Sequence, residues 1–277
     1  FKQKTAYEIG VRLVGSEMCI RDSLEMPVDG VPGDTLRAVR QMRESGVQAI
    51  VVLGGDGTHR LVAHECGSIP LVCVSTGTNN AFPQHHEATV VGLAAGAIAM
   101  GEVSVEMACR RSKRFTCTID GAPQIPGLVD VCVTTERWVG ARALWQPEHL
   151  QQLFLNFAEP GAIGLSSIGS LIQPIPRWEN TGLWIEFDAK SDRFIHAPIA
   201  PGLMGRVGIG DFRKINVGQK CVVAPLNGTI AFDGEKEVEF SAGNRVEITL
   251  LQDGPWIVDV VTVMRRIGEA GLLASGE

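Results

Sequence analysis

The sequence predicts an α/β N-terminal domain with a parallel sheet, followed by a mostly antiparallel β C-terminal domain. Between residues 24 and 101, helical patterns alternate with short apolar runs, which indicates βαβ crossovers and a parallel sheet. Two of these apolar runs end in glycine-rich loops, at the ends of strands where open α/β sheets bind ligands. Beyond residue 101, short β-rich runs recur between turn signals such as Asp120-Gly121 and Asp253-Gly254.

The domain boundaries follow from these changes of pattern. Residues 24–101 form the predicted α/β domain, and residues 102–277 form the predicted β-rich domain. Residues 1–23, FKQKTAYEIGVRLVGSEMCIRDS, resemble translated sequencing-adapter read-through, so we expect a non-native segment that stays outside fold reasoning. A genuine N-terminal segment with poor amphipathic character is the alternative.

The N-terminal elements are predicted from helix-capping signals and apolar runs. Asp34 is expected to N-cap a helix over residues 35–42, and Gly46 occupies the C′ position beyond its end. Residues 47–53 form a β-branched apolar run that is typical of an interior parallel strand. The next elements are expected to be a short helix over 60–66 closed by Gly67, a strand over 70–74, and a helix over 87–100.

The C-terminal elements are predicted mainly as strands, and one helix over residues 147–157 interrupts them. The basic cluster at 110–114 lies between two strand-like runs. It is expected to be a solvated hairpin end, with a patch for an anionic ligand as the alternative. The expected strands cover residues 103–109, 115–119, 128–135, 183–187, 222–224, 228–232, 245–251 and 256–263.

Composition limits the function classes. The chain has 277 residues, of which 45% are hydrophobic, enough for one large domain or two modest ones. Its net charge of −6 does not favour nonspecific nucleic-acid binding, and no apolar run approaches the ~20 residues that span a bilayer. Seven cysteines without a CxxC pair indicate no disulfide framework. We therefore expect a cytoplasmic protein that binds neither nucleic acid nor membrane.

The first candidate site is the loop Gly54-Gly55-Asp56-Gly57-Thr58, which follows the first apolar run. Its glycines let backbone N–H groups approach a ligand, and those groups and the next helix N-terminus attract anionic oxygens. Asp56 opposes that attraction unless it binds a cation or accepts a proton, so the loop indicates chemistry on a nucleotide. A glycine-rich turn with a solvated Asp is the alternative. Thr58 can either bind a phosphate or cap the helix.

Two further segments carry polar groups after apolar runs. In the loop at 75–80, STGTNN, the side-chain amides of Asn79 and Asn80 can hydrogen-bond a ribose, a base or a phosphate. Both residues are also typical of turns. In GTIAFDGE at 228–235, the Asp-Gly pair is by itself a common hairpin signal. The other residues of the second loop that we expect to bind nucleotide are Ser75, Thr76, Gly77 and Thr78.

Together, GGDGT at 54–58, IPLVCVSTGTNNAFP at 69–83 and GTIAFDGE at 228–235 resemble the signature segments of NAD kinases, diacylglycerol kinases and sphingosine kinases. When TTERWVGARALW at 134–145 is included, these motif sequences are most similar to those of the acetoin catabolism protein X group of ATP-NAD-kinase-like proteins. The resemblance implies a NAD-kinase-like two-domain fold with the site between the domains. It also implies ATP and Mg²⁺ as cofactors, a homo-oligomer and a link to acetoin breakdown.

The resemblance implies roles for particular residues. Asp56 would be the general base toward the acceptor hydroxyl, or would organise Mg²⁺ and the γ-phosphate of ATP. Asp233 and Glu235 would lie near nucleotide or metal. NAD kinases hold the ribose of the nicotinamide nucleotide with an Asn-Glu pair that this sequence lacks, and Glu136 is its nearest substitute. Arg137 and Arg142 lie in the same stretch.

The resemblance also implies one more βα unit ahead of residue 24, and a segment at 260–273 that returns to the first domain. Asn80 stands where lipid kinases have Asp, which disfavours lipid phosphorylation. The sequence lacks GxxxxGK[ST], which excludes a P-loop mechanism.

Three functions remain: a small-molecule kinase acting on NAD or a related metabolite, a non-catalytic nucleotide-binding accessory protein, and a lipid kinase. Replacing Asp56 by Asn is expected to abolish turnover in a kinase while nucleotide binding stays largely intact.

Overall fold

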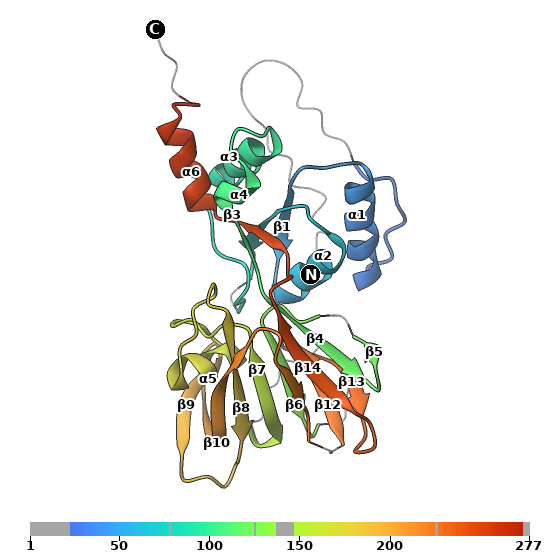
Figure 1. Cartoon of the computed structure of the whole chain (residues 1–277), viewed down its shortest axis with the longest axis vertical. Coiled ribbons are helices and arrows are strands. Elements are labelled where there is room, and N and C mark those ends of the chain that lie inside the picture. Colours follow the sequence, from blue (N-terminus) through green and yellow to red (C-terminus); the bar gives the residue numbers. More distant parts are fainter. Residues whose placement is uncertain (1–22, 78, 125, 137–146, 225–226, 274–277) are drawn as a thin grey trace.

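The computed structural model describes residues 23–77, 79–124, 126–136, 147–224 and 227–273. It has two parts (Figure 1): an α/β part in which helices flank a four-stranded sheet, and a β-rich part with a seven-stranded and a four-stranded sheet. The first part contains parallel strands, and the sheets of the second are mostly antiparallel. The fold class predicted from the sequence is therefore confirmed.

The α/β part is organised around β1 (Ile50–Gly54) and β2 (Leu71–Ser75), which pair in parallel. Their register places Gly54 opposite Ser75, so both glycine-rich loops leave the sheet at the same edge. Helices cover both faces of this sheet, and β2 is therefore buried along its whole length. These helices are α1 (Pro32–Glu44), α2 (Asp56–Glu65), α3 (Ala88–Ala99) and α4 (Val105–Ala108).

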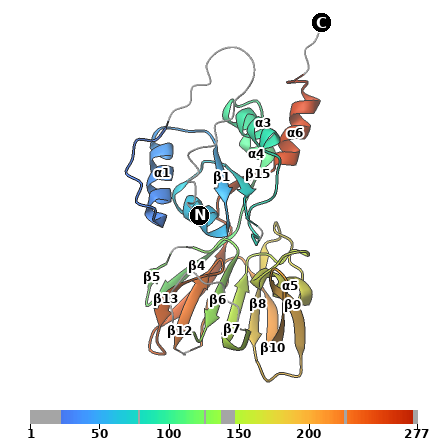
Figure 2. The same ribbon diagram turned by 180° about the vertical axis from the view of Figure 1, so that it is seen from behind.

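The segment that follows β14 lies in the α/β part as well. Strand β15 (Trp256–Val258) pairs in parallel with β2 and antiparallel with β3 (Cys109–Arg111), which gives the sheet order β1-β2-β15-β3. Helix α6 (Val260–Glu269) then packs against α3 (Figure 2). Two chain segments therefore connect the parts, one after β3 and one before β15.

The β-rich part contains two sheets that share an apolar core. The seven-stranded sheet has the order β13-β12-β6-β7-β8-β10-β9, and α5 (Leu165–Ile172) packs on its other face. The four-stranded sheet has the order β11-β14-β4-β5. The strands are β4 (Arg114–Ile119), β5 (Ala122–Pro123), β6 (Asp130–Thr134), β7 (Leu150–Leu155), β8 (Thr181–Phe187), β9 (Phe194–Ala200), β10 (Leu203–Asn216), β11 (Lys220–Val222), β12 (Gly228–Phe232), β13 (Glu235–Phe240) and β14 (Val246–Leu251).

Two predicted helix starts are wrong by a few residues. Helix α1 begins at Pro32, because proline suits the first helical position, and Asp34 lies inside the first turn. One Asp34 carboxylate oxygen accepts the N–H groups of Asp29, Gly30 and Val31, so it still satisfies free donors at this helix end. Helix α2 begins at Asp56 rather than at residue 60. Gly46 and Gly67 have positive φ after their helices, as predicted.

Three other predictions fail where short apolar runs fit either helix or strand. The predicted helix over 147–157 is a 3-10 turn (Pro147–His149) followed by the buried strand β7. The predicted strand over 103–109 is mostly α4. The predicted strand over 256–263 stops at Val258, because the Asp259 carboxylate accepts the Thr262 N–H and caps α6.

The basic cluster at 110–114 is not a hairpin end, since β3 and β4 belong to different sheets. Lys113 is buried in the connection between the two parts. Its Nζ donates to the carbonyl oxygens of Asn156 (2.7 Å) and Thr181 (2.6 Å). Burial lowers the pKa of Lys113 to about 8. The cluster therefore contributes one buried cation, Lys113, to the junction, while Arg110 is exposed as predicted.

Candidate functional site

The first motif forms the end of β1 and the start of α2. Gly55 is the N-cap and Asp56 is the first helical residue. The Asp56 carboxylate accepts the backbone N–H of Ala81 (2.9 and 3.2 Å) and of Phe82 (2.8 Å). Burial raises the pKa of Asp56, against the opposing effect of these two amides and of Arg177. Asp56 is therefore not a solvated side chain but holds the second loop to the first.

The glycines of the first motif leave room for specific neighbours. A Cβ on Gly54 would lie 2.8 Å from the Thr58 Cβ, and a Cβ on Gly57 would lie 2.9 Å from Glu235 Oε1. Thr58 lies inside α2, and no side chain of the described residues caps that helix, so the capping alternative for Thr58 is wrong. The missing side chain at Gly57 therefore lets the Glu235 carboxylate lie against the start of α2.

The second loop is closed by the Asn80 side chain. This amide hydrogen-bonds Ser75 Oγ at 2.9 Å, and it lies where a Cβ on Gly55 or on Gly77 would collide with it, at 2.8 and 2.9 Å. Asn80 therefore packs the two glycine-rich loops against each other. The exposed residues of the loop are Thr76, Gly77 and Asn79, while Thr78 lies outside the described residues.

The third motif is a two-residue hairpin turn in which Asp233 and Gly234 have φ of 50° and 82°. The Asp233 side chain is fully buried, and its carboxylate accepts the N–H groups of Leu128 (3.0 Å), Val129 (2.7 Å) and Asp130 (3.1 Å). The Asp233 oxygens therefore order the 128–130 segment, and a place for Asp233 near nucleotide or metal stays a prediction. Glu235, in contrast, has a side chain that is 55% exposed.

Arg60 connects α2 to this third motif, and the sequence analysis missed it. Its side chain is 3% exposed; Nε lies 3.6 Å from an Asp233 carboxylate oxygen, and a terminal nitrogen lies 3.9 Å from Glu235. Its guanidinium stands over the Phe232 ring at 5.8 Å. Since Asp56 and Arg60 are one turn apart on α2, this helix contacts both other motifs. The three motifs therefore meet at one place.

Arg177 is a second functional candidate that the sequence analysis missed. It precedes β8 in the β-rich part and is 7% exposed. Its two terminal nitrogens donate to the carbonyl oxygens of Phe82 (2.6 Å) and Ala81 (2.7 Å). The same two residues give their N–H groups to Asp56. No motif marks Arg177, because its partners are carbonyl groups that any sequence would supply.

The second loop also reaches α5. The side-chain oxygen of Asn79 lies 3.5 Å from the position that a Cβ on Gly164 would take. Gly164 is the N-cap of α5 and has a φ of 76°, so the N-terminus of this helix lies beside the loop. Helix N-termini favour anionic groups.

Glu136 lies at the end of β6 that is far from the third motif. In the pairing of β12 with β6, Thr229 lies opposite Thr134 and Phe232 opposite Val131. Asp233 and Glu136 therefore lie beyond opposite ends of this strand pair, roughly 13 Å or more apart at about 3.3 Å per residue. The expected substitution of Glu136 for the Asn-Glu pair stays a prediction. Arg137 and Arg142 lie outside the described residues.

Asp130 is a second buried carboxyl beside the third motif. Burial and the neighbouring Asp233 raise its pKa well above the usual value, and its Oδ1 has no hydrogen-bond partner among the described residues. Burial also raises the pKa of Asp233 to about 7, although Arg60 and the amides oppose this. The junction therefore contains two buried carboxyls whose neutral forms are favoured by burial.

Replacing Asp130 by Asn should change the unfolding free energy at pH 5 by no more than about 1 kcal/mol, because burial and Asp233 favour the neutral carboxyl, which the Asn amide resembles. A folded-state pKa above the unfolded one makes stability fall as pH rises from about 4 through the folded pKa. The variant should show a weaker fall. Urea unfolding at pH 5 to 8 measures the unfolding free energy of both proteins. If that free energy falls with pH as steeply in the variant as in wild type, Asp130 does not have a raised pKa in the folded state.

The residues fit Mg²⁺ bound through a nucleotide better than a metal held by the protein alone. Among the described residues, no group of three or more His, Cys, Asp or Glu side chains is placed to hold a metal. Asp56 and the exposed Glu235 can supply one or two carboxylates, as Mg²⁺ on phosphates requires. Within the described part of the chain, no helix has the length and apolar character needed to cross a bilayer.

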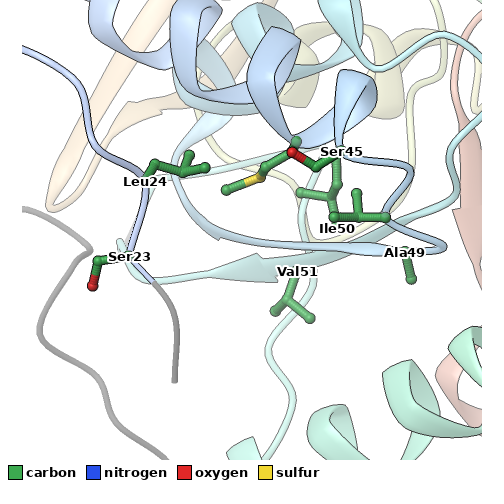
Figure 3. A pocket seen from close by; sticks show the side chains of 8 residues that line it. Ser23, Leu24, Ser45, Ala49, Ile50 and Val51 are labelled. Carbon is green, nitrogen blue, oxygen red and sulfur yellow. The ribbon is translucent and has the colours of Figure 1, made fainter. Parts of the chain in front are cut away.

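A separate hollow of about 410 Å³ lies beside β1 on the side of α1 (Figure 3). Its lining is mainly apolar and contains no residue of the three motifs. The lining residues are Ser23, Leu24, Met42, Ser45, Val47, Ala49, Ile50 and Val51.

Two family models match this chain. Residues 3–103 match the ATP-NAD kinase N-terminal domain, and residues 113–253 match the acetoin catabolism protein X C-terminal domain. The acetoin catabolism protein X of Cupriavidus necator is 42% identical over 260 residues, which cover 92% of this chain and 72% of that protein.

Solved structures with a similar fold include yeast NADH kinase complexed with NADH, at 13% identity and a TM-score of 0.48, over 83% of this chain and 68% of that one. A putative diacylglycerol kinase from Bacillus anthracis is 14% identical with a TM-score of 0.47, over 82% of this chain and 83% of that one.

Proposed function

This chain belongs to the acetoin catabolism protein X family, and from that premise we propose that it is an ATP-dependent kinase acting on NAD or a related small metabolite. We place this activity in the cytoplasm and link it to acetoin catabolism. The described cysteines are all free and buried, which fits a reducing compartment. A homo-oligomer is part of the proposal on the basis of the family resemblance.

The observation that carries the proposal is the meeting of three motifs at α2. Gly55 and Gly57 begin this helix, and the exposed Gly77 belongs to a loop leaving the same sheet edge. Backbone N–H groups at a glycine loop and a helix N-terminus bind phosphate oxygens. Phosphoryl transfer asks mainly for positioning and charge neutralisation. Such a loop pair therefore suits the phosphates of ATP.

Two acidic residues would take the remaining roles, which are proton acceptance and Mg²⁺ binding. Asp56 carries a raised pKa, which suits a group that takes the proton of an acceptor hydroxyl. Glu235, exposed beside Gly57, would help to hold Mg²⁺, which supplies charge neutralisation on the phosphates when bound. Asp233 and Arg60 lie behind these groups and set the position of Glu235.

A transfer assay tests the proposal. The full-length protein would be incubated with γ-labelled ATP, Mg²⁺ and a panel of acceptors that contains NAD, NADH, acetoin-pathway metabolites, diacylglycerol and sphingosine. Label on one acceptor would establish the kinase and identify its substrate. Label on a lipid, together with co-sedimentation on liposomes, would favour a lipid kinase, which Asn80 disfavours.

Replacing Glu235 by Gln should lower the transfer rate by about tenfold or more, because a carboxylate beside the phosphates is lost. The matched control is Glu239→Gln, which removes the same charge from the same strand, away from the turn. The control rate should stay within about twofold of wild type. Equal rates in both variants would contradict the placement of Glu235 in the site.

A non-catalytic nucleotide-binding accessory protein is the second candidate function. It is favoured by the Asp56 carboxylate, both of whose oxygens already accept backbone N–H groups. This candidate predicts that ATP or NAD binds, and that no acceptor in the panel is labelled. In that case Asp56 would hold the loops and take no part in chemistry.

A further inference from the structure

Arg177 is held firmly from its own side of the junction. Its guanidinium lies 4.2 Å from the centre of the Phe157 ring, and it forms an ion pair with Glu159 at 3.0 Å. Phe157 and Glu159 belong, like Arg177, to the segment between β7 and β8 in the β-rich part. Stacking on an aromatic face and pairing with a carboxylate fix the orientation of the planar guanidinium group of Arg177.

The other N–H groups of Arg177 form hydrogen bonds with residues of the α/β part. They bond the carbonyl oxygens of Ala81 and Phe82, while the N–H groups of the same residues bond Asp56. The backbone at 81–82 thus lies between a buried cation from one part and a carboxylate from the other. Hydrogen bonds with a charged partner are shorter and stronger than neutral ones. These contacts fix the position of residues 81–82, where the second loop ends.

We propose that Arg177 is a positioning residue of the site: by holding the carbonyl groups of residues 81–82 from the β-rich part, it keeps the second loop and Asp56 in register. Nucleotide binding then depends on the contact between the two parts, although Arg177 itself touches no substrate. The consequence for ATP rests on the proposed function. The contact with residues 81–82 does not, so the two can be tested separately.

The nearest rival explanation is that Arg177 only neutralises Glu159. The geometry distinguishes the two, because Glu159 is 40% exposed while Arg177 and the Phe82 carbonyl group that it meets are buried. An exposed carboxylate gains little from a salt bridge. Buried carbonyl groups lose a partner that water does not replace. Replacing Arg177 is therefore expected to perturb residues 81–82 more than it perturbs Glu159.

The test compares Arg177→Gln with Arg213→Gln in the full-length protein. Arg213 is the control for loss of stacking on an aromatic ring, because its exposed side chain places the guanidinium 4.2 Å from the Trp184 ring centre within the β-rich part, where β10 pairs with β8. Amide hydrogen exchange at Ala81 and Phe82 should accelerate at least about tenfold in Arg177→Gln, and exchange along β2 should not change. The dissociation constant of Mg-ATP should rise by about tenfold as well. Arg213→Gln should change neither quantity.

Two further variants separate positioning from a general loss of structure. Glu159→Gln leaves all carbonyl bonds of Arg177 in place, so its effect on exchange should be small and in the same direction. Arg177→Lys keeps the charge without the two-pronged geometry and should restore only part of the ATP affinity. If the acceptor assay gives transfer, the acidic limb of its pH profile should move to higher pH in Arg177→Gln, because the guanidinium favours ionised Asp56.

Unchanged exchange at residues 81–82 in Arg177→Gln would overturn the proposal, as would accelerated exchange with unchanged ATP affinity. A uniform acceleration that includes β2 would also overturn it, since Arg177 would then support the fold as a whole. Failure of the wild-type protein to bind ATP would refute the proposed function, while the exchange data would still decide whether Arg177 holds the loop.

Discussion

Replacing Asp56 by Ala is expected to abolish phosphoryl transfer and to weaken Mg-ATP binding by at least about tenfold. The carboxylate accepts the N–H groups of both Ala81 and Phe82, so its removal frees the second loop as well as removing the candidate base. Asp56→Asn should share part of this defect, because its amide keeps one acceptor oxygen and turns an N–H₂ group toward backbone donors. Nucleotide binding is therefore no longer expected to survive this substitution intact.

The measurement is calorimetric titration of Mg-ATP into the wild-type protein and both Asp56 variants, together with the transfer assay. Asp259→Ala is the control, because Asp259 also bonds a backbone N–H at a helix start in the same part of the molecule. It should cost about 1 kcal/mol of stability and leave ATP affinity unchanged. Unaltered ATP affinity in Asp56→Ala would show that the second loop keeps its position without Asp56.

Replacing Arg60 by Met is expected to destabilise the folded protein by about 3–5 kcal/mol. Arg60 is the buried cation that faces the Asp233 carboxylate, and Asp130 is a second buried carboxyl in the same region. Loss of the guanidinium leaves Asp233 without its counter-charge, and the pKa of Asp233 should rise further as a result. The variant should unfold at lower urea concentration, and the loss should be greater at pH 8 than at pH 5.

The sign of that pH dependence follows from the folded-state pKa. Asp233 holds its proton at low pH and needs no cation there, whereas the ionised form at pH 8 does. Arg40→Met is the control, because Arg40 pairs with Glu65 on the exposed surface of α1 at 2.6 Å. Its unfolding midpoint should stay close to wild type. A small, pH-independent effect of Arg60→Met would show that Arg60 does not compensate the buried carboxylate.

Local signals predicted the positions of the two glycine-rich loops. Parallel pairing of two apolar strands places the following loops at one edge, and the register of Gly54 with Ser75 confirms this. The Asp-Gly hairpin between β12 and β13 was also readable from its two residues. In each case the determining contacts lie within a few residues or follow from the fold class.

The missed features depend on partners distant in sequence. The amide partners of the Asp233 carboxylate lie at 128–130, and Arg177 meets the carbonyl groups of Ala81 and Phe82. Backbone groups carry no sequence signal, so no pattern shows where such a side chain bonds. The error over β7 has a different cause, since a six-residue apolar run fits a buried strand and a buried helix alike.

The most direct test of the central claim is where Mg-ATP binds, and backbone amide NMR spectra of the protein with and without Mg-ATP provide it. If the three motifs form one nucleotide site, the largest shift changes will occur at Gly55, Gly57 and Gly77 and at the amides of Ala81 and Phe82. Changes confined to the hollow beside β1, lined by Leu24, Met42 and Ile50 among others, would contradict the account, as would a spectrum that Mg-ATP leaves unaltered.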